Sequence, residues 1–158
     1  MSKREYYKRT VIFLLASLVI IAQALVFAYL WYNYYRELIY KPFWRRGNWV
    51  LVGLYALIDV MFSKLYGGLR VGYLKRIDVV YSLTLATICT NIVVYFQITL
   101  INRWFLSPTP LLLGTLVEFV IIVVWAFGSQ YVYSRLYRAR KLLVIYGDRK
   151  PDELIQKM

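Results

Sequence analysis

The sequence contains no histidine and a single cysteine, Cys89. Without histidine, zinc sites of the usual kind and general-base catalysis by an imidazole are excluded from this chain. Cys89 lies inside an apolar block, so it has no partner for an internal disulfide, and nothing near it indicates a metal ligand or a nucleophile. We therefore expect no metal site here.

Acidic residues are also scarce. The chain has 8 Asp and Glu against 20 Lys and Arg, which gives a formal net charge of +12. Nucleic-acid-binding proteins show such an excess. Here, however, nearly all basic residues lie outside the apolar blocks, where they set membrane topology and contact anionic lipids. We expect the lipid bilayer as a partner and no nucleic acid.

Apolar residues, by contrast, make up 61% of the chain and come in long blocks, whereas soluble proteins average about 45–50%. The 16 Tyr and 5 Trp gather mostly near block ends, where amphipathic rings favour the headgroup zone. Pro108 and Pro110 are expected as helix stops. The pattern predicts an all-α membrane fold, in which a basic N-terminus at 1–10 precedes a four-helix transmembrane bundle at 11–134. The expected spans are at about 11–32, 47–63, 77–101 and 110–132.

The distribution of basic residues predicts the orientation of the bundle. Twelve Lys and Arg lie in the N-terminal flank, the 64–76 hairpin and the segment 135–141, and five lie on the opposite side. Cytoplasmic loops carry such an excess. Both termini are therefore expected in the cytoplasm.

Three polar residues, Asp59, Asn91 and Glu118, lie inside the expected spans. Such residues are costly in a bilayer, so they face the bundle interior and often mark function. Asn91 and Glu118 lie at similar depth, which predicts a hydrogen bond between their helices. In one interpretation these residues form a relay for protons or substrate. In the other they form hydrogen bonds between helices, each of which stabilises the bundle by about 0.6 to 2 kcal/mol. Two acids without a basic partner favour the structural interpretation.

The most distinctive local sequence is the hairpin Tyr66-Gly-Gly-Leu-Arg-Val-Gly-Tyr-Leu-Lys-Arg. Its glycines break the helix. Arg70, Lys75 and Arg76 either contact the anionic oxygens of a lipid headgroup or polyprenyl phosphate, or they only set topology around a tight turn. The second interpretation is favoured, and the first stays open.

The segment 135–158 predicts a strand, a turn and the first turns of a helix. Such a unit cannot bury both its faces alone. We therefore expect the first strand and helix of a truncated α/β (Rossmann-like) cytoplasmic domain. Of the three glycines in the dinucleotide-binding fingerprint only Gly147 is present, and Asp152 and Glu153 would repel a phosphate. Nucleotide binding by this turn is not expected.

The order of these features is distinctive: a basic N-terminus, four spans, Tyr-Gly-Gly-Leu-Arg-Val-Gly leading into Lys-Arg-Ile-Asp, then Lys-Leu-Leu-Val-Ile-Tyr-Gly-Asp. In this order the chain resembles the N-terminal portion of the bacterial polyprenyl glycosylphosphotransferases. These large phosphoglycosyl transferases start exopolysaccharide and capsule assembly. The resemblance implies a multi-pass protein of the bacterial cytoplasmic membrane, with a Rossmann-like domain, a re-entrant helix and a catalytic domain after the four helices.

The resemblance also implies the reaction, which moves a sugar-1-phosphate from a UDP-sugar to undecaprenyl phosphate. Its magnesium and its catalytic Asp–Glu pair belong to the C-terminal domain, and neither residue of the pair has a counterpart here. No catalytic residue and no cofactor is therefore assigned to this chain, which alone would be inactive. Its expected role is to anchor its own downstream cytoplasmic and catalytic domains, in a natural protein that continues past Met158.

The sequence leaves two alternatives open, one for how the helices associate and one for the function. Gly53, Ala56, Gly114 and Gly128 allow close helix approach, either in a homodimer or in packing within one chain. The alternative function is a stand-alone small membrane scaffold or a channel or transporter subunit. That alternative would leave 142–145 as a hydrophobic strand with unpaired edges.

Overall fold

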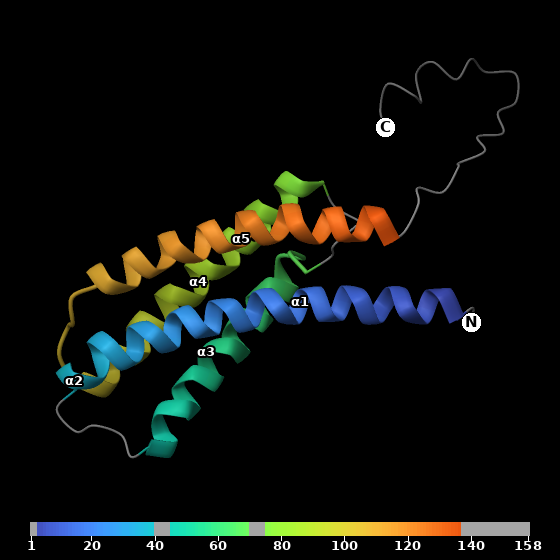
Figure 1. The fold of residues 1–158 in the computed structure, drawn as a ribbon. Helices are drawn as coiled ribbons and strands as arrows, with labels where there is room; N and C mark the ends of the chain where they lie inside the picture. Colours follow the sequence, from blue (N-terminus) through green and yellow to red (C-terminus); the bar gives the residue numbers. More distant parts are fainter. Residues whose placement is uncertain (1–2, 40–44, 70–74, 137–158) are drawn as a thin grey trace, which may run out of the picture.

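The computed structural model describes residues 3–39, 45–69 and 75–136 (Figure 1). Four helical stretches in these ranges are long and apolar enough to cross a membrane, so the expected all-α architecture with four spans is confirmed there. The expected α/β unit at 135–158 lies outside the described residues, apart from 135–136, which end α5. The elements are α1 (Lys3–Leu30), a π-helical turn η1 (Trp31–Tyr35), α2 (Arg36–Leu38), α3 (Arg45–Leu65), α4 (Arg76–Asn102) and α5 (Thr109–Leu136).

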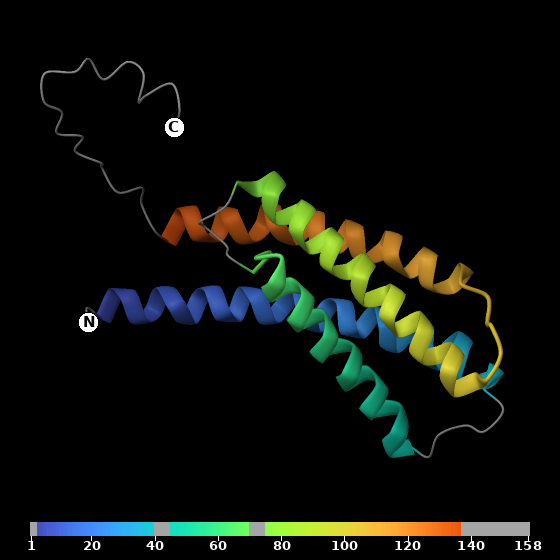
Figure 2. The same ribbon diagram turned by 180° about the vertical axis from the view of Figure 1, so that it is seen from behind.

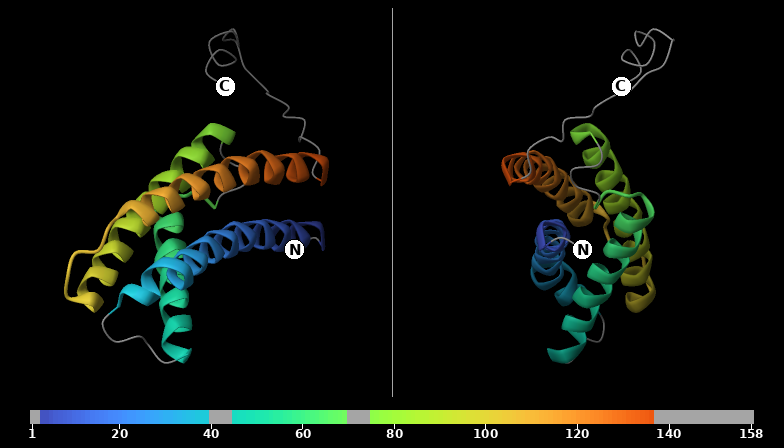
Figure 3. Two further views of the ribbon diagram at one scale, coloured as in Figure 1. Left: turned by 60° about the vertical axis from the view of Figure 1, so that its left-hand side comes forward. Right: turned by 90° about the vertical axis from the view of Figure 1, so that its right-hand side faces the viewer.

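The four long helices form a bundle in which each packs against the next, and α5 also packs against α1. The start of α1 and the end of α5 lie at the same end of the molecule (Figures 1 and 2). The side views in Figure 3 show α3 and α4 crossing α1 and α5 obliquely. Because successive helices alternate in direction, α3 ends and α4 begins toward that same end.

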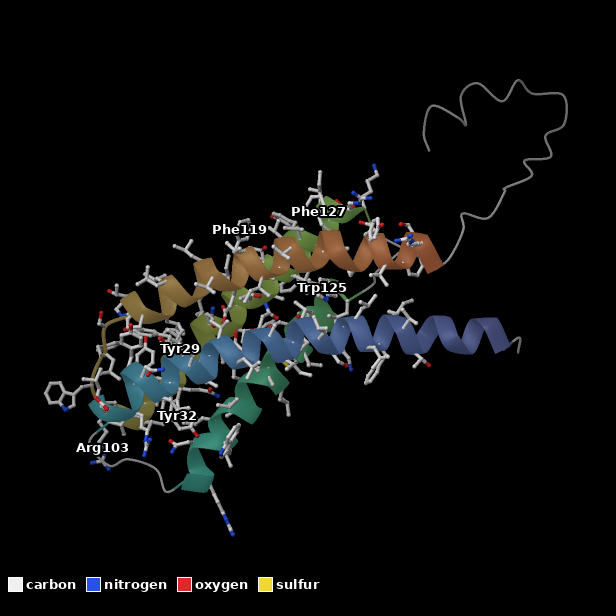
Figure 4. The ribbon with its side chains drawn as sticks, viewed as in Figure 1. Tyr29, Tyr32, Arg103, Phe119, Trp125 and Phe127 are labelled. Atoms are coloured by element: carbon white, nitrogen blue, oxygen red, sulfur yellow. The ribbon has the colours of Figure 1, made fainter. Side chains whose placement is uncertain are left out.

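The outer surface of the bundle is apolar. Large side chains such as Leu14, Leu57 and Leu100 are 60%, 63% and 78% exposed. Figure 4 shows Phe119 and Phe127 on the side of α5 turned away from α1. A surface of this kind is unfavourable in water and suits a hydrocarbon solvent, in which apolar side chains cost nothing to expose.

The interior consists of two apolar clusters. One gathers around Phe27, Trp31 and Tyr55, and the other around Val19, Leu83 and Ile122. Apart from Asn48, Asn102 and Ser129, the buried polar residues form one set with their hydrogen-bonding neighbours Tyr55 and Thr115, and on α1, α4 and α5 this set lies between the parts that contribute to the two clusters. We call this set the polar layer; its members are Gln23 of α1, Tyr55, Asp59 and Ser63 of α3, Thr87, Thr90 and Asn91 of α4, and Thr115 and Glu118 of α5.

The end of α3 is a Schellman motif. The N–H of Gly68 donates to Ser63 O at 3.0 Å, and the N–H of Gly67 donates to Lys64 O at 3.2 Å. Gly67 has a φ of 74°, the left-handed conformation that glycine adopts without steric cost. The expected helix break in the hairpin is present at these two glycines.

The expectation that Pro108 and Pro110 both stop a helix is wrong. α4 ends at Asn102, and Arg103 caps it in the left-handed conformation with a φ of 63°. Pro108 O instead accepts the first hydrogen bond of α5, from Leu112 N at 3.0 Å, and Pro110 lies in the first turn of α5. Proline is favoured there because its missing N–H would have no partner and its φ already suits a helix.

The far end of α1 widens into the π-helical turn η1. The N–H of Arg36 bonds to Trp31 O across five residues. Trp31 Nε1 donates to Asn48 Oδ1 at 3.0 Å, and the Tyr35 hydroxyl donates to Ser107 O at 3.3 Å. This turn therefore ties α1 to the start of α3 and to the α4–α5 connection.

Candidate functional site

Glu118 on α5 is the best-connected member of the polar layer. Its side chain is 1% exposed. The Tyr55 hydroxyl donates to Oε1 at 2.8 Å, and Asn91 Nδ2 donates to Oε2 at 2.7 Å. Each carboxyl oxygen therefore has one strong donor, and the predicted hydrogen bond between Asn91 and Glu118 is present. These two bonds join α3, α4 and α5 through one carboxyl group.

Neighbouring groups hold this carboxyl and its donors in place. Asn91 Nδ2 also donates to Thr115 Oγ1 at 2.8 Å, and Thr115 in turn donates to Leu111 O at 2.8 Å. The Tyr55 ring stacks on Phe27 of α1, with centroids 4.5 Å apart and planes 5° apart. The Glu118 network therefore contacts all four long helices.

Asp59 lies one turn beyond Tyr55 on the same face of α3 and is 0% exposed. Unlike Glu118, it receives no hydrogen bond on either carboxyl oxygen from any described residue. Thr90 on α4 interacts with this carboxyl, but its hydroxyl donates to Ala86 O at 2.9 Å. The two carboxyl groups of the layer therefore lie in different surroundings, one with two donors and one with none.

Gln23 and Thr87 form a second link within the layer. Gln23 Nε2 donates to Thr87 Oγ1 at 2.6 Å, and Thr87 donates to Leu83 O at 2.9 Å. Gln23 Oε1 is buried and has no partner among the described residues. Sequence reasoning missed Gln23, although a lone amide in the middle of the first apolar block was a usable signal. It also missed Tyr55, whose hydroxyl has no signature in a chain with 16 tyrosines.

A shallow groove of about 660 Å³ between α4 and α5 reaches the edge of the layer. Asn91 and Thr115 line it together with apolar side chains such as Ile92 and Leu112. Two members of the polar layer, both in the Glu118 network, therefore line this groove on the outer side of the bundle.

The basic hairpin residues lie away from the layer, at the start of α4. Lys75 precedes the helix, Arg76 is its first residue, and both are exposed. The guanidinium carbon of Arg76 lies 5.8 Å from the centroid of the Phe127 ring, a cation–π contact that joins α4 to α5. Arg70, the third expected headgroup contact, lies outside the described residues.

The donor set of the layer does not form an ordinary metal site. Within residues 3–39, 45–69 and 75–136, no group of three or more His, Cys, Asp and Glu side chains is placed to hold a metal ion. The chemistry present consists of two buried carboxyl groups with hydroxyl and amide neighbours. It can hold or pass small positive charges and protons, and it can also simply join helices.

Comparison with known proteins adds nothing to this description, since no family model, no curated protein and no solved structure matches the chain.

Proposed function

We propose that this chain is the membrane-anchoring region of an undecaprenyl-phosphate sugar-1-phosphate transferase of exopolysaccharide or capsule synthesis. The observation that carries the proposal is the set of four membrane-length helices in the order that the resemblance implies, with the glycine-rich hairpin between the second and third. The catalytic residues and their magnesium belong to a domain outside this chain. The role of the bundle is to hold that domain at the membrane, where the lipid phosphate acceptor is concentrated in two dimensions.

The proposed orientation puts both termini on the cytoplasmic side of the bacterial inner membrane. Exposed Lys75, Arg76 and Arg135 all belong to the end of the bundle at which α1 begins and α5 ends. Basic side chains at this level favour anionic headgroups of the inner leaflet. Lys75 and Arg76, with Arg70, are the groups that would contact a lipid headgroup or a polyprenyl phosphate.

The alternative of a channel or transporter subunit has one observation in its favour, the polar layer itself. A transport path needs polar groups along the length of the bundle. In the described part of the chain, an apolar cluster lies on each side of the layer, around Trp31 at one end and around Leu83 at the other. This arrangement favours the anchor over the path.

The test compares two membrane preparations, one holding this 158-residue chain and the other the product of its complete gene. Each receives undecaprenyl phosphate, magnesium and UDP-sugars labelled in the sugar. We expect labelled lipid in the second preparation and none in the first. Transfer by the isolated chain would refute the proposal that the catalytic residues lie outside it. If the complete gene product transferred no sugar-phosphate from any UDP-sugar, the proposed transferase function would be refuted.

A further inference from the structure

The buried polar atoms that lack a partner in the described ranges are mostly hydrogen-bond acceptors. In the described ranges every such side-chain atom is an oxygen, and none is a nitrogen. Buried polar groups normally find a partner, so a set biased to one kind indicates what is needed to complete it. Four of the six described atoms are amide or carboxyl oxygens, which can only accept a hydrogen bond or bind a small cation, whereas the hydroxyl oxygens of Ser63 and Thr84 can also donate. The atoms are Gln23 Oε1, both carboxyl oxygens of Asp59, Ser63 Oγ, Thr84 Oγ1 and Asn91 Oδ1.

Asp59 contributes two of these six unpartnered atoms. Ser63, one turn further along α3, is 1% exposed and presents an unpartnered hydroxyl on the same face. The titratable groups that interact with Asp59 are Tyr55 on its own helix and Glu118 on α5. The layer receives only the uncharged Gln23 from α1 and uncharged groups such as Thr90 from α4. No described lysine or arginine is buried in the layer to neutralise it.

The two carboxyl groups therefore differ in what they can hold. Glu118 has a donor on each oxygen, which is the arrangement that stabilises a carboxylate. Asp59 has none. A second bare carboxylate beside the first, in a medium of low dielectric constant, would be opposed by both desolvation and repulsion. One positive charge on or beside Asp59 removes both costs.

We propose that Asp59 is the centre of a binding site for one monovalent cation, either a proton carried on its carboxyl group or a sodium ion held by the oxygen atoms around it. A bound proton would be donated to Thr90 Oγ1, whose lone pairs are available because its own hydrogen points to Ala86 O. A sodium ion would use Asp59 together with Ser63. A bound proton would join α3 to α4 at the middle of the bundle, whereas a sodium ion would link two successive turns of α3. The proposal does not depend on the proposed function.

The experiment uses the full chain in lipid nanodiscs and infrared difference spectroscopy of carboxyl groups. In one arm the pH changes while choline chloride is the only salt. In the other arm sodium chloride replaces choline chloride at fixed pH. We expect a carboxyl signal that is lost in Asp59→Asn. A signal that responds to pH alone identifies a proton as the ligand, and a signal that also responds to sodium chloride at fixed pH identifies sodium. The matched control is Asp78→Asn, which removes an exposed carboxyl group of α4 and should leave the signal unchanged.

Specific labelling keeps the test decisive if Asp59→Asn does not fold. Wild-type protein carrying carboxyl-labelled aspartate should show the isotope shift in the responding signal, whereas protein carrying labelled glutamate should not. A signal that survives Asp59→Asn, or that shifts only with labelled glutamate, overturns the assignment to Asp59. Absence of any carboxyl response in both arms overturns the site itself.

Discussion

Replacing Tyr55 with phenylalanine removes one of the two donors of Glu118 and little else. The Tyr55 ring stacks on Phe27 and is 0% exposed, and the substitution keeps that ring in place. The loss is confined to the 2.8 Å hydrogen bond to Glu118 Oε1. The variant therefore measures what this single bond contributes to the bundle.

The expected loss of unfolding free energy follows from the environment of the bond. Hydrogen bonds to charged groups contribute about 1.5–3 kcal/mol in soluble proteins. Bonds between helices in a membrane average about 0.6 kcal/mol and reach about 1.7 kcal/mol. Since Glu118 is 1% exposed and keeps only Asn91 as a donor, the value should lie in the upper part of the membrane range. We expect about 1 to 1.7 kcal/mol, near a tenfold change in the folding equilibrium.

The measurement is reversible unfolding in mixed detergent micelles, with Tyr29→Phe as the control because Tyr29 is 64% exposed. A double-mutant cycle with Glu118→Gln then isolates the pair. We expect the tyrosine substitution to cost less when Glu118 is already an amide, by about 1 kcal/mol. The reasoning is refuted if Tyr55→Phe costs no more than Tyr29→Phe, or if the two substitutions are additive within about 0.5 kcal/mol.

Three glycine substitutions test the helix contacts in the same assay. A methyl group at Gly114 would collide with the Leu30 side chain, whereas one at Gly128 would meet nothing within 4 Å. Gly114→Ala should therefore lower the free energy of unfolding by about 1 to 2 kcal/mol. Gly128→Ala should leave it unchanged or raise it by up to about 1 kcal/mol. Equal effects of the two substitutions would contradict the contact between Gly114 and Leu30. Gly68→Ala would place a methyl group 2.8 Å from Cγ of Leu83, which is 0% exposed and cannot move aside. We expect a loss of about 2 to 3 kcal/mol, and a neutral result would contradict the close approach of the hairpin to α4.

The sequence predicted the architecture well because bilayer-length apolar blocks allow little else. Depth along the spans was also enough to predict the contact between Asn91 and Glu118. It was not enough to predict the isolation of Asp59, since a hydrogen bond depends on the rotation of each helix about its axis. Pro110 was assigned to the wrong role for a related reason, because a proline between two helices suits the start of the second as well as the end of the first.

The π-helical turn η1 has a consequence for how the length of the first span can vary. Trp31 and Tyr35, the first and last residues of η1, are buried four residues apart. In a regular α-helix each such step would overshoot by about 40°, and the wider turn absorbs part of that drift because it holds one extra residue. Loss of one residue at exposed Asn33 or Tyr34 would convert it into an ordinary turn and leave the direction of the helix beyond it unchanged. A one-residue deletion, which elsewhere in a membrane helix misaligns everything beyond it, can be accommodated at this point by the backbone itself.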